Sequence, residues 1–122
     1  MLFRSVPADS GKTILMAANG IDITLPSAAK GMELTIIQSA DYDTAVCTVV
    51  QAAATEDFYG ALYGSAQGES AGTDADVAGA SDTKIQFGSA SLKGDRIRLV
   101  SDGTGWYAEA FAQNYAAITF EN

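Results

Sequence analysis

Residues 95–110 run Asp95-Arg96-Ile97-Arg98-Leu99-Val100, then Ser101-Asp102-Gly103-Thr104-Gly105, then Trp106-Tyr107-Ala108-Glu109-Ala110. In both outer segments apolar and polar side chains alternate, which is the period of a β-strand with one buried face. The central loop contains two glycines, and glycine tolerates the positive φ angles that tight hairpin loops require. We therefore predict a β-hairpin over 95–110, with Trp106 packed in the core and Tyr107 facing the other way.

Short segments of the same kind recur along the rest of the chain. Some alternate apolar and polar residues, and others are rich in β-branched or aromatic residues, as strands are. We expect further strands at Thr13–Ala18, Ile21–Leu25, Met32–Ile37, Ala45–Val50, Phe58–Tyr63, Thr83–Phe87 and Ala117–Phe120. A helix over 43–54 is the alternative for one of them, but β-branched residues in that segment argue against it. The expected fold is all-β, a β-sandwich or jelly-roll-like barrel of about eight short strands.

The length of 122 residues fits one domain. We expect an N-terminal arm over 1–12 and a single β domain over 13–122. From Ser65 to Asp82 the composition changes to Gly, Ala, Ser, Thr and Asp, which predicts a long acidic surface loop. Loops of this length are often functional, and a tolerated insertion is the alternative.

The charge distribution restricts the partners. The formal net charge is −8, and the chain from Glu33 to Asp82 contains carboxylates but no Lys or Arg. The main cationic cluster is Lys93, Arg96 and Arg98, which is too small to neutralise a run of phosphates. We therefore expect neither nucleic acid nor an anionic membrane as a partner, whereas a basic protein surface is compatible. The N-terminus lacks the pattern of a signal peptide, which favours synthesis in the cytoplasm.

Residues able to carry catalysis are scarce. The chain has no histidine, which excludes Ser-His-Asp and Cys-His sites, and its one cysteine, Cys47, is expected to be a small buried hydrophobe. Gly68–Gly72 fits the nucleophile-elbow pattern but lacks the histidine that this site needs. The carboxylate pairs Asp41/Asp43 and Asp74/Asp76 could bind a hard cation, although a solvated acidic loop is the alternative for both. We expect a protein that is not an enzyme and uses no cofactor.

Two stretches resemble segments of small bacteriophage virion proteins. They are Ile23-Thr24-Leu25-Pro26-Ser27-Ala28-Ala29-Lys30-Gly31-Met32, followed by Thr35-Ile36-Ile37, and the segment Gly94–Tyr107. With them the chain resembles a capsid decoration (cement) protein of a tailed phage. The resemblance implies a β-sandwich on the outer capsid surface, bound to the major capsid protein and often trimeric at local three-fold positions. Similar β segments also occur in modules of phage tail fibres and tail-associated proteins.

This resemblance leads to a hypothesis about the partner-binding residues. In it, Leu2, Phe3, Arg4 and Val6 of the arm insert between coat subunits, while Tyr59, Leu62 and Tyr63 meet at a trimer axis. The arm could instead cover an edge of the sandwich. The competing hypothesis is a receptor- or glycan-binding module of a tail fibre or tail-associated protein, with the 65–82 loop as its contact surface.

Overall fold

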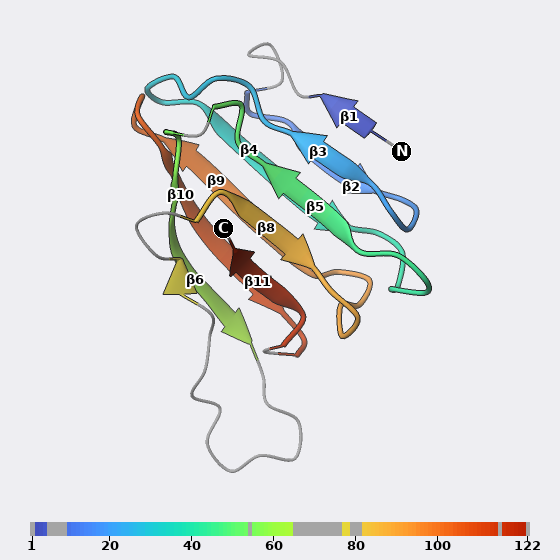
Figure 1. Cartoon of the computed structure of the whole chain (residues 1–122). Helices are drawn as coiled ribbons and strands as arrows, with labels where there is room; N and C mark the ends of the chain where they lie inside the picture. The colour runs from blue at the N-terminus through green and yellow to red at the C-terminus, as the bar shows by residue number, and fades with distance from the viewer. Residues whose placement is uncertain are drawn as a thin grey trace.

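The computed structural model describes residues 10–53, 55–64, 82–114 and 116–121, together with the backbone of 2–4 and 77–78. These residues form eleven strands in two sheets that lie face to face (Figure 1). The described residues form no helix, and so they contain no helix that could cross a membrane. The all-β prediction is confirmed, and the architecture is a β-sandwich.

One layer is a mixed five-stranded sheet. Its strands lie in the order β1 (Leu2–Arg4), β3 (Asp22–Thr24), β5 (Cys47–Val50), β8 (Lys84–Phe87) and β11 (Ile118–Glu121). The pairs β1–β3 and β3–β5 are parallel, and the other two are antiparallel.

The other layer is a mixed six-stranded sheet. Its order is β2 (Thr13–Met16), β4 (Glu33–Gln38), β9 (Arg96–Ser101), β10 (Trp106–Ala112), β6 (Phe58–Gly64) and β7 (Val77–Ala78). The pairs β2–β4 and β10–β6 are parallel, and the other three are antiparallel. The expected hairpin over 95–110 is the β9–β10 pair.

All nine strands expected from the sequence are present, and β1 and β7 are additional. β1 is the edge strand of the five-stranded sheet and pairs in parallel with β3. Residues 2–4 of the expected N-terminal arm therefore lie in the sandwich and cover one of its edges.

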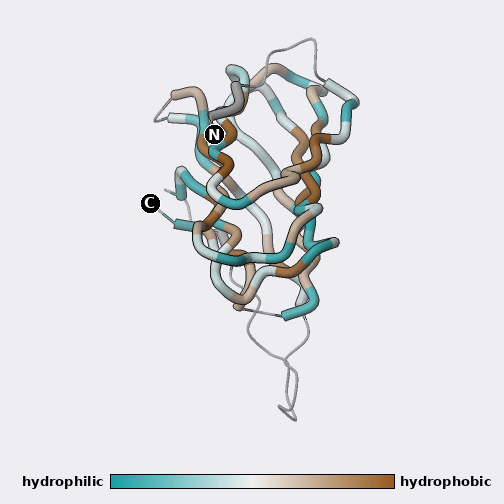
Figure 2. The backbone as a smooth tube through the Cα atoms, turned by 90° about the vertical axis from the view of Figure 1, so that its right-hand side faces the viewer, coloured by the Kyte–Doolittle hydropathy of each residue, from teal (hydrophilic) through white to brown (hydrophobic). Residues whose placement is uncertain are grey.

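The core fills the space between the layers. Hydrophobic stretches run along the strands of both layers when the molecule is seen from the side (Figure 2). Trp106, Phe58 and Phe87 are the largest fully buried side chains, and Cys47 is buried as expected. Trp106 faces inward and Tyr107 outward, which confirms the prediction made from their alternation.

Close approach of β6 and β10 depends on one glycine. Gly60 has a φ of +143°, and a Cβ atom at this position would overlap the backbone carbonyl of Ala108 on β10. Only glycine combines this backbone angle with such a contact. Gly60 therefore allows the parallel β6–β10 ladder, which positions the surface described next.

Candidate partner-binding face

The outer surface of the five-stranded sheet is polar and internally paired. Its outward side chains on the four strands with described side chains are Asp22, Thr24, Thr48, Val50, Lys84, Gln86, Thr119 and Glu121. Lys84 Nζ lies 3.1 Å from Glu121 Oε2, and the Thr48 hydroxyl donates a hydrogen bond to Asp22. Thr119 Oγ1 donates to Glu121 Oε1 at 3.1 Å. This surface has the character of an ordinary hydrated sheet face.

The outer surface of the six-stranded sheet is different, because large apolar side chains are exposed on it. They are Leu15 (59% exposed), Tyr59 (40%), Tyr63 (59%), Tyr107 (52%) and Phe111 (42%). Among the described residues, Leu92 is the one other large hydrophobic residue that is exposed. We call the outer surface of β2, β4, β9, β10 and β6 the aromatic face. Large apolar side chains exposed together on one sheet face often mark a site of interaction.

The four aromatic rings form two cross-strand pairs. Tyr59 is opposite Tyr107 in the β6–β10 register, and Tyr63 is opposite Phe111. The Tyr59–Tyr107 ring centroids are 6.0 Å apart, and the Tyr63–Phe111 rings stack at 5.4 Å with an interplanar angle of 23°. The two pairs are four residues apart along each strand, which separates them by about 13 Å at 3.3 Å per residue.

The Tyr63–Phe111 pair belongs to a row that crosses the sheet. In the strand register this row continues through Arg96 on β9 and Ile37 on β4 to Leu15 on β2. The Arg96 guanidinium carbon lies 5.7 Å from the centroid of the Phe111 ring, which is a cation–π geometry. Phe111 is therefore held between an aromatic neighbour and a cationic one.

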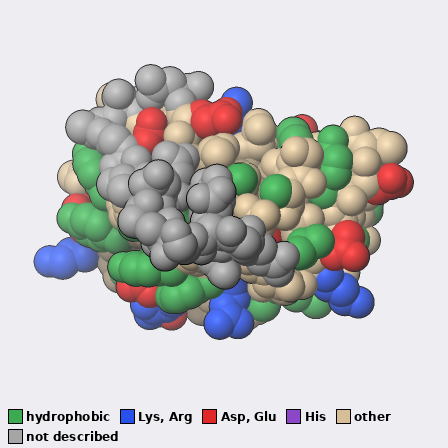
Figure 3. All heavy atoms as spheres, turned by 90° about the horizontal axis from the view of Figure 1, so that it is seen from below, with side chains coloured by type: hydrophobic (Ala, Val, Ile, Leu, Met, Phe, Trp, Pro, Cys, Tyr) green, Lys and Arg blue, Asp and Glu red, His purple; other side chains and the backbone are tan. Residues whose placement is uncertain are grey.

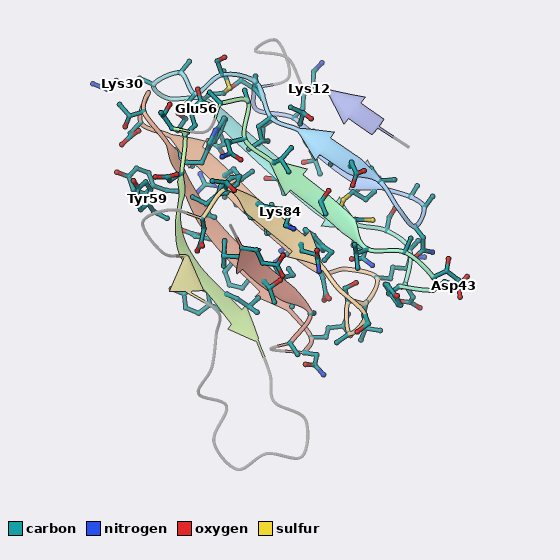
Figure 4. All side chains as sticks on the ribbon, in the orientation of Figure 1. Lys12, Lys30, Asp43, Glu56, Tyr59 and Lys84 are labelled. Carbon is teal, nitrogen blue, oxygen red and sulfur yellow. The ribbon has the colours of Figure 1, made fainter. Side chains whose placement is uncertain are left out.

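The Tyr59–Tyr107 pair is oriented from the hairpin loop. Tyr107 Oη donates a hydrogen bond of 3.0 Å to Asp102 Oδ2, while Asp102 Oδ1 accepts from the backbone N–H groups of Thr104 and Gly105 at 2.8 and 3.0 Å. These backbone hydrogen bonds, together with those from the Thr104 and Tyr107 hydroxyls, hold the pKa of Asp102 well below its usual range. The same carboxylate raises the pKa of Tyr107. Tyr59, on β6, projects away from the sandwich (Figure 4).

Charged side chains lie between and beside the rings. Glu109, which is exposed, lies between the two aromatic residues of β10. Its register partner Arg98 forms an ion pair with Glu33 instead, with Nη2 and Oε1 3.0 Å apart. Seen from below, hydrophobic side chains reach the surface next to Lys or Arg and Asp or Glu groups (Figure 3).

A hollow of about 500 Å³ lies at one end of the aromatic face. It is lined by Tyr63, Gly64, Gly94, Asp95, Arg96, Phe111, Ala112 and Gln113. The Asp95 side chain is buried beneath it, and its Oδ2 and Oδ1 accept hydrogen bonds from the backbone N–H groups of Leu92 and Gln113 at 2.8 and 3.0 Å. Asp95 therefore joins the turn before β9 to the residue that follows β10.

The structure brings two of the expected binding residues together and excludes a third. Tyr59 and Tyr63 both lie on the aromatic face, whereas Leu62 has no exposed surface and belongs to the core. The expectation for Leu62 was wrong because strand alternation places it with Phe58 on the inner side of β6. The side chains of Leu2, Phe3 and Arg4, the whole of Val6, and most of the 65–82 loop lie outside the described residues.

Leu15, Tyr107, Phe111 and Arg96 of the face were not assigned to a binding site from the sequence. Tyr107 was expected to face outward, but Phe111 and Arg96 were not considered as binding residues. Continued alternation past Ala110 would have found Phe111, because residues 107, 109 and 111 share one side of β10.

Of the carboxylate pair Asp41/Asp43, the Asp41 side chain binds the backbone of another segment. Asp41 Oδ1 accepts a hydrogen bond of 2.7 Å from the backbone N–H of Lys93, and the backbone N–H of Asp43 donates to Asn19 Oδ1 at 2.8 Å. Within the described parts of the chain, no three ligand-type side chains are grouped as a metal site. Asp74 and Asp76 lie outside those parts.

Comparisons with models of known families, with curated proteins and with solved structures gave no match to this chain.

Proposed function

We propose that this protein is a capsid decoration protein of a tailed bacteriophage, which binds the outer surface of the assembled shell and stabilises it. Two observations support the proposal: the resemblance of residues 23–37 and 94–107 to small virion proteins, and the aromatic face. The observation that carries it is the contrast between the two outer surfaces. One surface pairs its own polar groups, while the other exposes four aromatic rings.

The composition of the aromatic face suits contact with another protein. Tyr and Arg are enriched among the residues that dominate protein–protein binding energy. The row from Leu15 through Ile37 to Tyr63 provides aliphatic and aromatic surface across five strands. Because the rings are attached to hydrogen-bonded strands and paired with each other, little conformational entropy is lost when they bind.

Shell stabilisation follows from preferential binding. A protein that binds the expanded shell but not its disassembled subunits stabilises the shell. The stabilising free energy grows with the logarithm of the ratio between the concentration of free decoration protein and its Kd. In this proposal the aromatic face contacts the major capsid protein and neighbouring copies in a homotrimer at the virion surface. The edge strand β1, at the other side of the sandwich, provides a second contact with the shell.

A receptor- or glycan-binding module of a tail fibre is the second candidate. It is favoured by the position of Glu109 between two aromatic pairs, because sugars combine an apolar ring face with hydroxyl groups that bind carboxylates. In this alternative the same face binds a glycan, and the protein does not bind shells.

The test is to mix the purified protein with expanded and unexpanded shells of the phage that encodes it, and to count bound copies after sedimentation. The expected result is saturable binding to expanded shells, greatly reduced in the double variant Tyr63→Ala/Phe111→Ala. The matched control is Thr48→Ala/Gln86→Ala on the opposite surface, which should bind like the unmodified protein. Absence of binding to either kind of shell would contradict the decoration proposal.

A further inference from the structure

The hollow beside Phe111 has a shape and a lining that differ from the rest of the aromatic face. Gly64 at the end of β6, Gly94 in the turn before β9 and Ala112 at the end of β10 carry little or no side chain, so the rims are low where the hollow lies. The stacked Tyr63–Phe111 pair forms an apolar wall. Its volume of about 500 Å³ is large enough for one or two side chains of a binding partner.

The polar groups of the hollow are mostly occupied, with one exception. Both carboxylate oxygens of Asp95 accept backbone hydrogen bonds, and Gln113 Nε2 donates to the carbonyl of Lys93 at 2.9 Å. Arg96 is exposed, and its guanidinium lies over the Phe111 ring. A cation–π contact leaves the N–H donors of a guanidinium available for a carboxylate.

Both cationic and acidic side chains lie around the hollow: Arg96 and Asp95 line it, and Glu109 lies two residues from Phe111 on the same side of β10. Lys93, Arg96 and Arg98 are three of seven cationic residues in a chain of net charge −8. Arg98 is neutralised by Glu33, whereas Arg96 lines the hollow, and the backbone carbonyl of Lys93 accepts a hydrogen bond from Gln113 Nε2. Because both oxygens of Asp95 accept backbone N–H groups, the Arg96 guanidinium is the charged group of the hollow that can pair with an incoming carboxylate.

We propose that the hollow anchors a short, carboxylate-bearing peptide segment of the protein partner. This rests on the proposed function, and it names the chemistry of the contact. A Glu or Asp side chain pairs with the Arg96 guanidinium, and an adjacent apolar side chain packs against Phe111 and Tyr63. The carboxylate and the ring contact then select an acidic segment with apolar residues over a basic one.

The probes are the peptides acetyl-Glu-Leu-Glu-Leu-amide and acetyl-Lys-Leu-Lys-Leu-amide, titrated into the full-length isotope-labelled protein by NMR. The acidic peptide should shift the backbone amides of Gly64, Gly94, Ala112 and Gln113, with a Kd on the order of 1 mM for so short a ligand. Arg96→Gln should weaken this binding about tenfold or more. Lys84→Gln removes one positive charge from the opposite surface and should leave the binding unchanged. Preserved amide dispersion in both variants shows that each is folded.

Several results would overturn the inference. They are equal shifts with the basic peptide, unchanged affinity in Arg96→Gln, or shifts at these amides with methyl glucoside but not with the acidic peptide, which would assign the hollow to a carbohydrate. Shell binding separates the two proposals. Normal shell binding by Arg96→Gln refutes the anchor and leaves the decoration role intact, whereas peptide binding without any shell binding refutes the decoration role alone.

Discussion

Replacing Gly60 with alanine should destabilise the protein more than any other single methyl addition at a described glycine. The φ of +143° costs an L-residue about 1–3 kcal/mol. The added Cβ overlaps the Ala108 carbonyl, so β6 and β10 must separate locally, and each ladder hydrogen bond weakened there adds about 1 kcal/mol. The sum is about 3–5 kcal/mol, a large part of the 5–15 kcal/mol that stabilises a typical domain.

Urea unfolding measures this effect directly. With an m value of about 2 kcal/mol per molar, the midpoint for Gly60→Ala should fall by about 2 M. Gly103→Ala is the matched control, because Gly103 also has a positive φ (+98°) but its Cβ would lie 3.6 Å from Lys30, without overlap. That variant should lose only about 1–2 kcal/mol. If the two variants unfold at the same urea concentration, the close approach of β6 and β10 is not what Gly60 provides.

Three further predictions concern the surfaces and the loop. Phe111→Ala should lower the free energy of unfolding by only about 1–2 kcal/mol, against about 3–5 kcal/mol for the buried Phe87→Ala, and chemical denaturation of the two variants checks this difference. The pKa of Glu121 is lowered chiefly by Lys84, so the stability from this pair is present at neutral pH and is lost as the pH falls through the lowered value. Lys84→Gln should therefore cost less than about 1 kcal/mol at pH 7 and nothing in strong acid, and a cost that persists in acid would exclude the ion pair as its origin. Asp102→Asn should lower the pKa of Tyr107 toward its ordinary value, because the carboxylate that raises it is lost, and a phenol titration followed by ultraviolet absorbance would refute this if the pKa did not move.

The strands of this protein could be predicted because their signals are local. Alternation over 95–110 and its glycine-containing loop correctly predicted the β9–β10 hairpin and the opposite directions of Trp106 and Tyr107. The order of strands in each sheet is not a local property, since the parallel pairs β2–β4, β3–β5 and β10–β6 join segments that are distant in sequence. β1 and β7 are only three and two residues long, and such short strands are defined by their partners instead of their own pattern.

The candidate site was predicted only in part, because it too depends on how strands that are distant in sequence pair. Tyr59 and Tyr63 could be selected as exposed aromatic residues of one strand, but alternation should have excluded Leu62. Their ring partners Tyr107 and Phe111 lie on β10, about 48 residues further along the chain, and they meet because of the β6–β10 register. Arg96 becomes part of the site only once β9 pairs with β10 and places its guanidinium over Phe111.

The most direct test of the central claim is a reconstruction of shells decorated with this protein by electron cryo-microscopy. Our account predicts that the aromatic face, with Tyr59, Tyr63, Tyr107 and Phe111, is buried against the shell protein or a neighbouring copy. It also predicts that the surface bearing Lys84 and Glu121 faces the solvent. A decorated shell in which the Lys84–Glu121 surface makes the contacts and the four rings remain exposed would contradict it.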